Sequence, residues 1–250
     1  GEIEQVEHTY AVIGNMNEHQ LTVVESTWGG RPELVDTTGI IDYGSLMQLA
    51  LERAKTAREA IKVMTGLVKK YGYYSSGESF TIADPNEAWI LDLIGKGPGR
   101  RGAVWVAVRI PDDCIAGHAN YPRIHKIPMD DKENCLYSPD VISFAREMGY
   151  FDGLNKDFSF ARAYSPADFG ALRACDARVW SFFRKYDSTM DNYLPYVNGE
   201  SAEPFPLYVK PSRKLSVQDM KEAMRDHFED TPFDMTQDVG AVSYTHLRAH

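Results

Sequence analysis

Cysteine is scarce in this sequence. Its 250 residues include three cysteines, Cys114, Cys135 and Cys175, which form no C-x-x-C pair. Their spacing indicates neither a zinc site nor a disulfide framework, and it favours a reducing compartment. Long apolar runs are also missing, because no segment approaches the roughly 20 residues of a membrane-spanning helix. We therefore predict no metal site and no membrane span. Export stays open, since the chain begins at Gly1 in the middle of a pattern.

Positive charge is the next shortage. Lys and Arg number 27 against 36 Asp and Glu, which gives a formal net charge of −9. Binding to nucleic-acid phosphates needs clustered basic side chains, and the pairs Lys69-Lys70 and Arg100-Arg101 are short. We expect no nucleic-acid partner. Hydrophobic residues make up 43% of the chain, an ordinary globular composition with room for one large core or two small ones.

Two catalytic signatures are missing as well. Residues 95–102 are rich in glycine and basic side chains, but they lack the order of a phosphate-binding loop, and Pro98 removes a backbone donor. Cys114 and His118 are not expected to form a nucleophile–base pair. Four residues of a strand span about 13 Å, whereas such a pair needs a separation of about 3 Å. A buried structural cysteine is the simpler interpretation of Cys114.

The hydrophobic patterns that are present predict an α+β fold with a largely antiparallel sheet. Residues 45–71 have helical periodicity, and Thr56 and Glu59 resemble a capping box, so we divide this stretch into two helices near Lys55-Thr56. Ser165 and Ser216 are expected to cap later helices. The predicted strands are 9–14, 21–27, 78–83, 87–94, 102–110 and one that begins at Cys114. The remaining predicted helices are 139–148, 169–186 and 217–228.

Polar clusters follow two of these strands. The first cluster, Glu25 to Trp28, ends the strand 21–27. The second cluster, HANYPRI, begins at His118 and follows the strand that begins at Cys114. Such clusters mark either the point where a strand leaves the core or the wall of a pocket. Asn120 is a neutral donor of the kind that binds an oxyanion, with a turn asparagine as the structural alternative. Arg173 is either a charged site residue or a helix-surface arginine.

Three segments in order resemble the bacterial cysteine dipeptidases related to secernins, which belong to the N-terminal nucleophile hydrolases. The first is NMNEHQLTVVESTWGGR at 15–31. The second joins GIIDYGSL and ERAKTAREAI to YSSGESFTIADPNEAWILDLIG, which ends at Gly95. The third, GAVWVAVRIPDDCIAGHANYPRI at 102–124, is followed by SPADFG. The resemblance extends from Gly1 to about Gly240 and implies one partial domain over 1–240. It implies an αββα sandwich, two antiparallel sheets between helix layers, and no cofactor.

The resemblance also implies a site. Asn120 corresponds to an oxyanion donor, Thr27 stands where related acylases have a second donor asparagine, and Arg173 best matches their site arginine. Thr27 would act through its backbone N–H. Glu25 and Trp28 are expected to flank the pocket, with Glu25 facing a dipeptide's free amine. Asn17 and His118 complete the expected substrate contacts.

The implied function is that of a cysteine-type dipeptidase. The family's nucleophile is a cysteine made N-terminal by processing, so we expect it upstream of Gly1 and expect the chain alone to be inactive. Residues 241–250 resemble a translated sequencing adapter and are expected to be non-native. A related acylase that cleaves a non-peptide amide, or a non-catalytic binding relative, stays an alternative. A dipeptide is the expected partner, and oligomeric state and compartment stay open.

Overall fold

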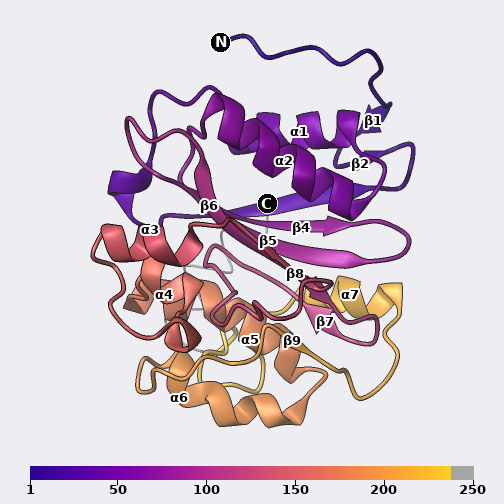
Figure 1. Ribbon diagram of the computed structural model, residues 1–250. Helices are drawn as coiled ribbons and strands as arrows, with labels where there is room; N and C mark the ends of the chain where they lie inside the picture. The colour runs from indigo at the N-terminus through magenta and orange to yellow at the C-terminus, as the bar shows by residue number, and fades with distance from the viewer. Residues whose placement is uncertain (238–250) are drawn as a thin grey trace.

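The computed structural model describes residues 1–237 and is organised around a seven-stranded antiparallel sheet (Figure 1). The strand order is β1-β2-β3-β4-β5-β6-β8, and a second, two-stranded sheet pairs β7 with β9. The predicted α+β class with an antiparallel sheet is confirmed. The resemblance implies two antiparallel sheets. In residues 1–237 the first sheet has seven strands and the second has two. The strands are β1 (Val12–Ile13), β2 (Met16–Asn17), β3 (Thr22–Trp28), β4 (Gly77–Ala83), β5 (Ala88–Gly95), β6 (Ala103–Ile110), β7 (Ile115–Ala116), β8 (Cys135–Tyr137) and β9 (Tyr208–Val209).

Two helices, α1 (Tyr43–Arg53) and α2 (Ala57–Tyr71), cover one face of this sheet (Figure 1). They separate where the sequence predicts, because the Thr56 hydroxyl accepts a hydrogen bond from the Glu59 N–H at 3.3 Å. The Glu59 carboxylate in turn accepts from the Lys55 N–H at 2.8 Å. The first bond satisfies a donor that a helix start leaves without an intrahelical partner, and the second fixes the residue that precedes the cap.

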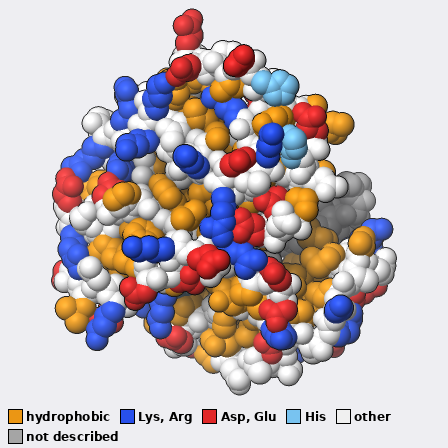
Figure 2. Space-filling view, turned by 45° about the vertical axis from the view of Figure 1, so that its right-hand side comes forward, with side chains coloured by type: hydrophobic (Ala, Val, Ile, Leu, Met, Phe, Trp, Pro, Cys, Tyr) orange, Lys and Arg blue, Asp and Glu red, His pale blue; other side chains and the backbone are white. Residues whose placement is uncertain are grey.

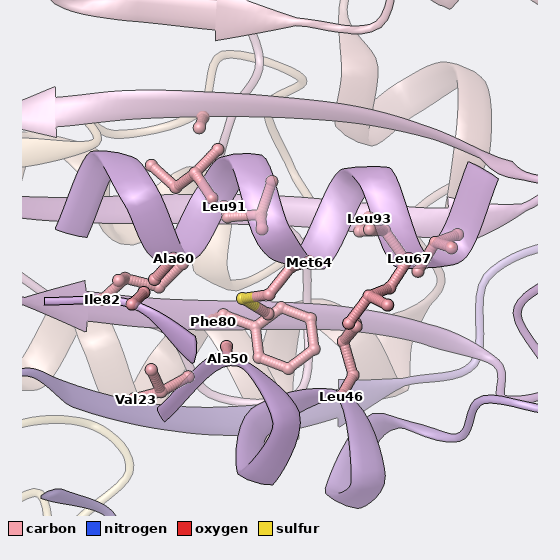
Figure 3. Close-up of a cluster of buried hydrophobic side chains, with 14 of the residues drawn as sticks. Val23, Leu46, Ala50, Ala60, Met64, Leu67, Phe80, Ile82, Leu91 and Leu93 are labelled. Carbon is pink, nitrogen blue, oxygen red and sulfur yellow. The ribbon is translucent and has the colours of Figure 1, made fainter. Parts of the chain in front are cut away.

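Side chains of the central strands point alternately to the two faces of the sheet, and this divides the core into two layers. In β5, Leu91 and Leu93 pack against α1 and α2, while Ile90 and Ile94 face the opposite side. Successive side chains of a strand point to opposite faces, so a strand buried on both faces is apolar throughout. Figure 3 shows the helix-side layer, with Met64 of α2 above Phe80 of β4.

The C-terminal half of the chain covers the other face of the sheet (Figure 1). Its α-helices are short, and a π-helical turn, η3 (Ala171–Asp176), leads directly into α5. Phe183 of α5 belongs to an aromatic cluster with Phe205, Phe228 and Phe233. The α-helices are α3 (Val141–Glu147), α4 (Phe160–Tyr164), α5 (Ala177–Arg184), α6 (Leu194–Val197) and α7 (Val217–Ala223). Short 3-10 turns occupy η1 (Pro32–Leu34), η2 (Asn155–Asp157) and η4 (Ser188–Tyr193).

Several predicted boundaries differ from the structure. Ser165 does not begin a helix but ends α4, where its N–H donates to the Ala161 carbonyl. The Asp168 carboxylate instead accepts from the Ala171 N–H and starts the next helix. Ser216 caps α7 as predicted, yet this helix stops at Ala223, because the chain turns to bury Phe228 in the aromatic cluster. The strand predicted at 9–14 shortens to β1, and the proposed tail 241–250 lies outside the described residues.

The charged surface and the helix lengths can be described for the same residues. Acidic and basic side chains are interspersed over the face drawn in Figure 2. Within residues 1–237, no helix combines the length and the apolar character needed to cross a membrane. The longest of them, α2, has 15 residues.

Candidate active site

The end of β3 is where the polar side chains gather. β3 pairs with β4 so that Thr27 lies opposite Glu78 and Trp28 opposite Gly77. Because side chains alternate, Glu25 and Thr27 share the face of Val23, which packs toward α1 and α2. Ser26 and Trp28 point to the other face, where the segment after β7 crosses the sheet.

Asn120 is held against this strand end by three hydrogen bonds. Its N–H donates to the Ser26 Oγ at 3.1 Å, and its Nδ2 donates to the Thr27 carbonyl at 2.5 Å. Arg178 of α5 donates to the Asn120 Oδ1 at 2.9 Å. The φ of Asn120 is +56°, a left-handed conformation that asparagine tolerates better than most residues. The structure therefore brings together the two residues expected to bind an oxyanion.

Arg178 is a contact that the sequence did not reveal. The arginine singled out there, Arg173, lies in the π-helical turn with its guanidinium 3.7 Å from the ring centroid of Phe233. Arg178 follows five residues later and also donates to the Ala119 carbonyl at 3.0 Å. Only the path of residues 117–124 decides which arginine reaches Asn120, so the helical pattern alone could not identify it.

His118 bridges the two strands at the base of the site. Its Nδ1 lies 2.6 Å from the Ser26 Oγ and its Nε2 lies 2.9 Å from the Thr81 Oγ1. Burial lowers the pKa of His118 to about 4, so the ring is neutral at physiological pH. Cys114, whose Sγ contacts Asp113, is not its partner. The absence of a Cys114–His118 pair agrees with the prediction, and His118 positions β3 relative to β4.

Trp28 belongs to the core in this structure, with 2% of its surface exposed. Its indole N–H donates to the Ser79 Oγ at 3.1 Å, and Ser79 donates to the Asp92 Oδ1 at 2.6 Å. The Asp92 Oδ2 accepts from the backbone N–H groups of Arg123 and Ile124 at 2.9 and 2.8 Å. This chain of bonds fixes the segment that contains Asn120 against the sheet. Burial raises the pKa of Asp92 to about 6, although these donors oppose the shift.

Asn17 closes a turn. Its Nδ2 donates to the carbonyls of Leu51 and Ala54 at 2.7 and 2.8 Å, and its Oδ1 accepts from the N–H groups of His19 and Leu21. With 5% of its surface exposed, Asn17 joins the β2–β3 turn to the end of α1. We expected Asn17 among the substrate contacts. In the structure, backbone groups engage both polar atoms of its side chain.

Glu78 is a further acidic residue that the sequence analysis did not single out. It is fully buried, and its Oε1 accepts a hydrogen bond from the Thr27 Oγ1 at 2.7 Å. Its Oε2 meets no N–H or hydroxyl donor among the described residues, and its side chain lies within hydrogen-bond reach of the Glu25 carboxylate. Burial, together with the neighbouring Glu25 carboxylate, raises the pKa of Glu78 to about 8. The sequence pattern of a strand could not predict this raised pKa. The pattern shows which face of the sheet a residue occupies, but not which side chains lie beside it.

Glu78 should make the stability of the fold depend on pH. Below about pH 4.5 its carboxyl is protonated in both folded and unfolded chains, so burial imposes no pH-dependent cost there. Between about pH 4.5 and pH 8 only the unfolded chain releases the proton, so the free energy of unfolding falls as the pH rises. We expect a loss of up to about 3 kcal/mol between pH 5 and pH 8.

Urea unfolding of the wild type and of Glu78→Gln at these two pH values measures this loss. The amide cannot ionise, so the variant should lack the part of the loss that Glu78 causes. Contributions from Asp92 and the buried histidines are common to both proteins and cancel in the comparison. The same pH dependence in both proteins would contradict the assignment to Glu78.

Comparison with known proteins places this site in a family. The model of peptidase family C69 matches residues 1–249. The chain belongs to peptidase family C69. This membership confirms the resemblance to bacterial cysteine dipeptidases that the three segments indicated.

Relatives of this C69 chain include three curated bacterial proteins. A probable dipeptidase of Salmonella dublin is 29% identical over 86% of this chain and 48% of its own length. A dipeptidase of Bifidobacterium longum is 26% identical over 88% of the chain and 41% of its own length. Dipeptidase A of Lactobacillus helveticus is 26% identical over 85% of the chain and 42% of its own length. The chain thus spans less than half of the length of these relatives.

The cysteines and acidic residues of this C69 chain suggest neither a nucleophile nor a metal. Burial raises the pKa of Cys135 to about 11 and also raises that of Cys114, so both thiols resist ionisation. Cys175 lies in the π-helical turn. Among residues 1–237, no three His, Cys, Asp or Glu side chains gather as a metal ion would need.

Proposed function

We propose that the complete protein is a cysteine-type dipeptidase whose nucleophile lies outside this chain. Membership of peptidase family C69 and the dipeptidase names of the relatives support this proposal. The observation that carries it is the position of Asn120 at the end of β3, where its amide meets the backbone of Thr27.

We propose that Thr27 and Asn120 supply two donors for an oxyanion. The Asn120 amide has two N–H donors, and one of them binds the Thr27 carbonyl. In an antiparallel strand the N–H and C=O of one residue point to the same side. In this proposal the Thr27 N–H faces the same edge as its carbonyl and donates together with the second N–H of Asn120. Two such donors stabilise the negative charge that forms when a nucleophile attacks a carbonyl.

The reaction follows from this arrangement. The cysteine thiolate adds to the carbonyl carbon of the dipeptide, and the oxygen takes up negative charge between Thr27 and Asn120. The C–N bond then breaks, and the leaving amine takes the proton that the nucleophile's own α-amine removed from the thiol, which releases the C-terminal amino acid. Water hydrolyses the thioester and releases the N-terminal amino acid. No metal takes part in this scheme.

Glu25 faces the cationic end of the substrate in this proposal. It lies one residue before Ser26 on the half-buried end of β3, and its charge suits a dipeptide's free amine. The catalytic role of Arg173 and the substrate contacts of Asn17, Trp28 and His118 stay predictions. For Asn17 and Trp28, the hydrogen bonds described above supply a structural role instead.

Assays of the complete protein on free dipeptides and on N-acyl amides test this function. We expect hydrolysis of dipeptides and none by residues 1–240 alone. Cleavage confined to N-acyl amides would identify an acylase and contradict the dipeptidase. Substrate binding without turnover would identify a binding protein.

A further inference from the structure

A row of hydrogen bonds joins β4 to the backbone of Asn120. The Thr81 Oγ1 lies 2.9 Å from the His118 Nε2, and the His118 Nδ1 lies 2.6 Å from the Ser26 Oγ. The Ser26 Oγ in turn accepts the Asn120 N–H at 3.1 Å. Side chains from β3, β4 and the segment after β7 therefore meet in one continuous set of contacts, and this set ends at the residue proposed to bind the oxyanion.

The Ser26 hydroxyl is held on two sides. A serine oxygen offers one O–H donor and two acceptor lone pairs. The Asn120 N–H binds one lone pair, and the His118 Nδ1 binds either the O–H or the other lone pair, according to the tautomer of the ring. In both tautomers the histidine leaves one lone pair of Ser26 free for Asn120. Because Thr81 holds the other nitrogen of the ring, the orientation of His118 fixes the oxygen that receives the Asn120 N–H.

Asn120 depends on such contacts because its backbone is in an unfavourable conformation. Its φ is +56°, and a residue other than glycine keeps a left-handed conformation only where the surrounding structure holds it there. The side chain is held by the Thr27 carbonyl and by Arg178, whereas the backbone N–H is held by Ser26. The bond to Ser26 therefore fixes the peptide unit from which the side-chain amide extends.

We propose that Ser26 and His118 are positioning residues for the side-chain amide of Asn120. This inference rests on the proposed dipeptidase function, in which the second N–H of that amide binds the developing negative charge. An oxyanion donor acts at about 2.7–3.1 Å, and a misplacement of about 1 Å lowers a rate by up to about 10²-fold. Neither Ser26 nor His118 touches the substrate in this proposal, because both act through Asn120.

Two substitutions of His118 separate this role from a purely structural one. Asparagine has a polar atom as many bonds from the backbone as Nδ1, and glutamine has one as many bonds away as Nε2. His118→Asn should therefore keep the contact with Ser26, whereas His118→Gln should keep only the contact with Thr81. For L-alanyl-L-alanine and the complete protein, we expect kcat to fall about tenfold in His118→Gln and in Ser26→Ala, with KM within about twofold. His118→Asn should keep kcat within about threefold of the wild type.

A double-mutant cycle shows whether Ser26 acts through Asn120. Asn120→Gly already lacks the amide, so adding Ser26→Ala should lower kcat by less than about twofold more. Ser159→Ala is the matched control, because the Ser159 Oγ also lies between a backbone N–H, that of Arg162, and a histidine Nδ1, that of His125. Ser159 caps α4 and does not belong to the candidate active site, so this control should keep the wild-type kcat and KM.

Hydrogen exchange tests the same geometry without turnover. Ser26 protects the Asn120 N–H, so the peptide that contains Asn120 should exchange faster in Ser26→Ala and in His118→Gln than in the wild type. His118→Asn and Ser159→Ala should exchange there as the wild type does. Thermal unfolding shows whether each variant is folded. Ser26→Ala removes a single hydroxyl, so it tests the proposal even if a variant of His118 does not fold.

Each outcome decides the matter. Faster exchange at Asn120 in Ser26→Ala, in a protein that hydrolyses no dipeptide, would support the placement of Asn120 by Ser26 and reject the proposed function. Dipeptide hydrolysis at the wild-type kcat in Ser26→Ala and His118→Gln would support the function and overturn this inference. Equal losses in His118→Asn and His118→Gln would show that the ring does not act through Ser26. A further loss of about tenfold when Ser26→Ala is added to Asn120→Gly would show that the serine acts independently of the amide, and would also overturn the inference.

Discussion

Replacing Asp176 by alanine is expected to lower the free energy of unfolding by about 3–5 kcal/mol. Arg123 and Asp176 form an ion pair with an Nη1–Oδ1 distance of 3.1 Å, and their side chains are 0% and 1% exposed. The Tyr196 hydroxyl also donates to the Asp176 Oδ2 at 2.9 Å. Removing the carboxylate leaves a buried guanidinium without its counter-charge and a buried hydroxyl without its acceptor. Both effects destabilise the fold.

The same pair joins the two halves of the chain. Arg123 follows the segment that contains Asn120, and its guanidinium lies 3.9 Å from the ring centroid of Phe205 and donates to the Pro206 carbonyl. Asp176 ends the π-helical turn beneath the sheet. Loss of the pair should therefore loosen the C-terminal layer together with the polar end of β3.

Urea unfolding followed by tryptophan fluorescence measures the effect of Asp176→Ala. Asp191→Ala is the matched control, because Asp191 also pairs with an arginine, Arg184, but its side chain is 58% exposed. An exposed pair contributes about 0–1 kcal/mol, so the control should remain near the wild type. A loss below about 1 kcal/mol in Asp176→Ala would contradict the importance of the buried pair.

Replacing Asn120 by alanine in the complete protein is expected to lower kcat by about 10²–10³, with little change in KM. The Asn120 amide is proposed to bind the oxygen of the attacked carbonyl only as it becomes charged. Its loss therefore raises the barrier without weakening binding of the ground state. The Thr27 N–H and the nucleophile remain, so activity should fall but not vanish.

The backbone of Asn120 requires a second variant. Alanine is strained at a φ of +56°, whereas glycine adopts this conformation freely and also lacks the amide. Asn120→Gly should therefore show the same loss of kcat with less loss of stability. Asn86→Ala, in the exposed turn between β4 and β5, is the control. Wild-type rates in both Asn120 variants would remove this residue from the active site.

Local sequence signals predicted the helix side of the fold well. The break between α1 and α2 depends on Thr56, and the turn between β4 and β5 depends on Asp84, whose carboxylate accepts from the N–H groups of Asn86 and Glu87. These contacts join residues a few positions apart, so residue type and spacing are enough to specify them. Ser165 was expected to cap the helix predicted at 169–186, but the Asp168 carboxylate caps it instead, because Ser165 ends α4, which the sequence did not reveal.

By itself the sequence determined the α+β class, the main strands, the helix pair and the resemblance to the family, which depends on residue order within segments. It also identified Asn120, Thr27 and Glu25 as candidates. Only the tertiary structure decided which partners they have. Arg178 reaches Asn120, and Glu78 lies buried beside Thr27, through contacts across 58 and 51 positions of the chain. Charge, burial and unsatisfied oxygens are properties of such neighbours in space, and no local pattern encodes them.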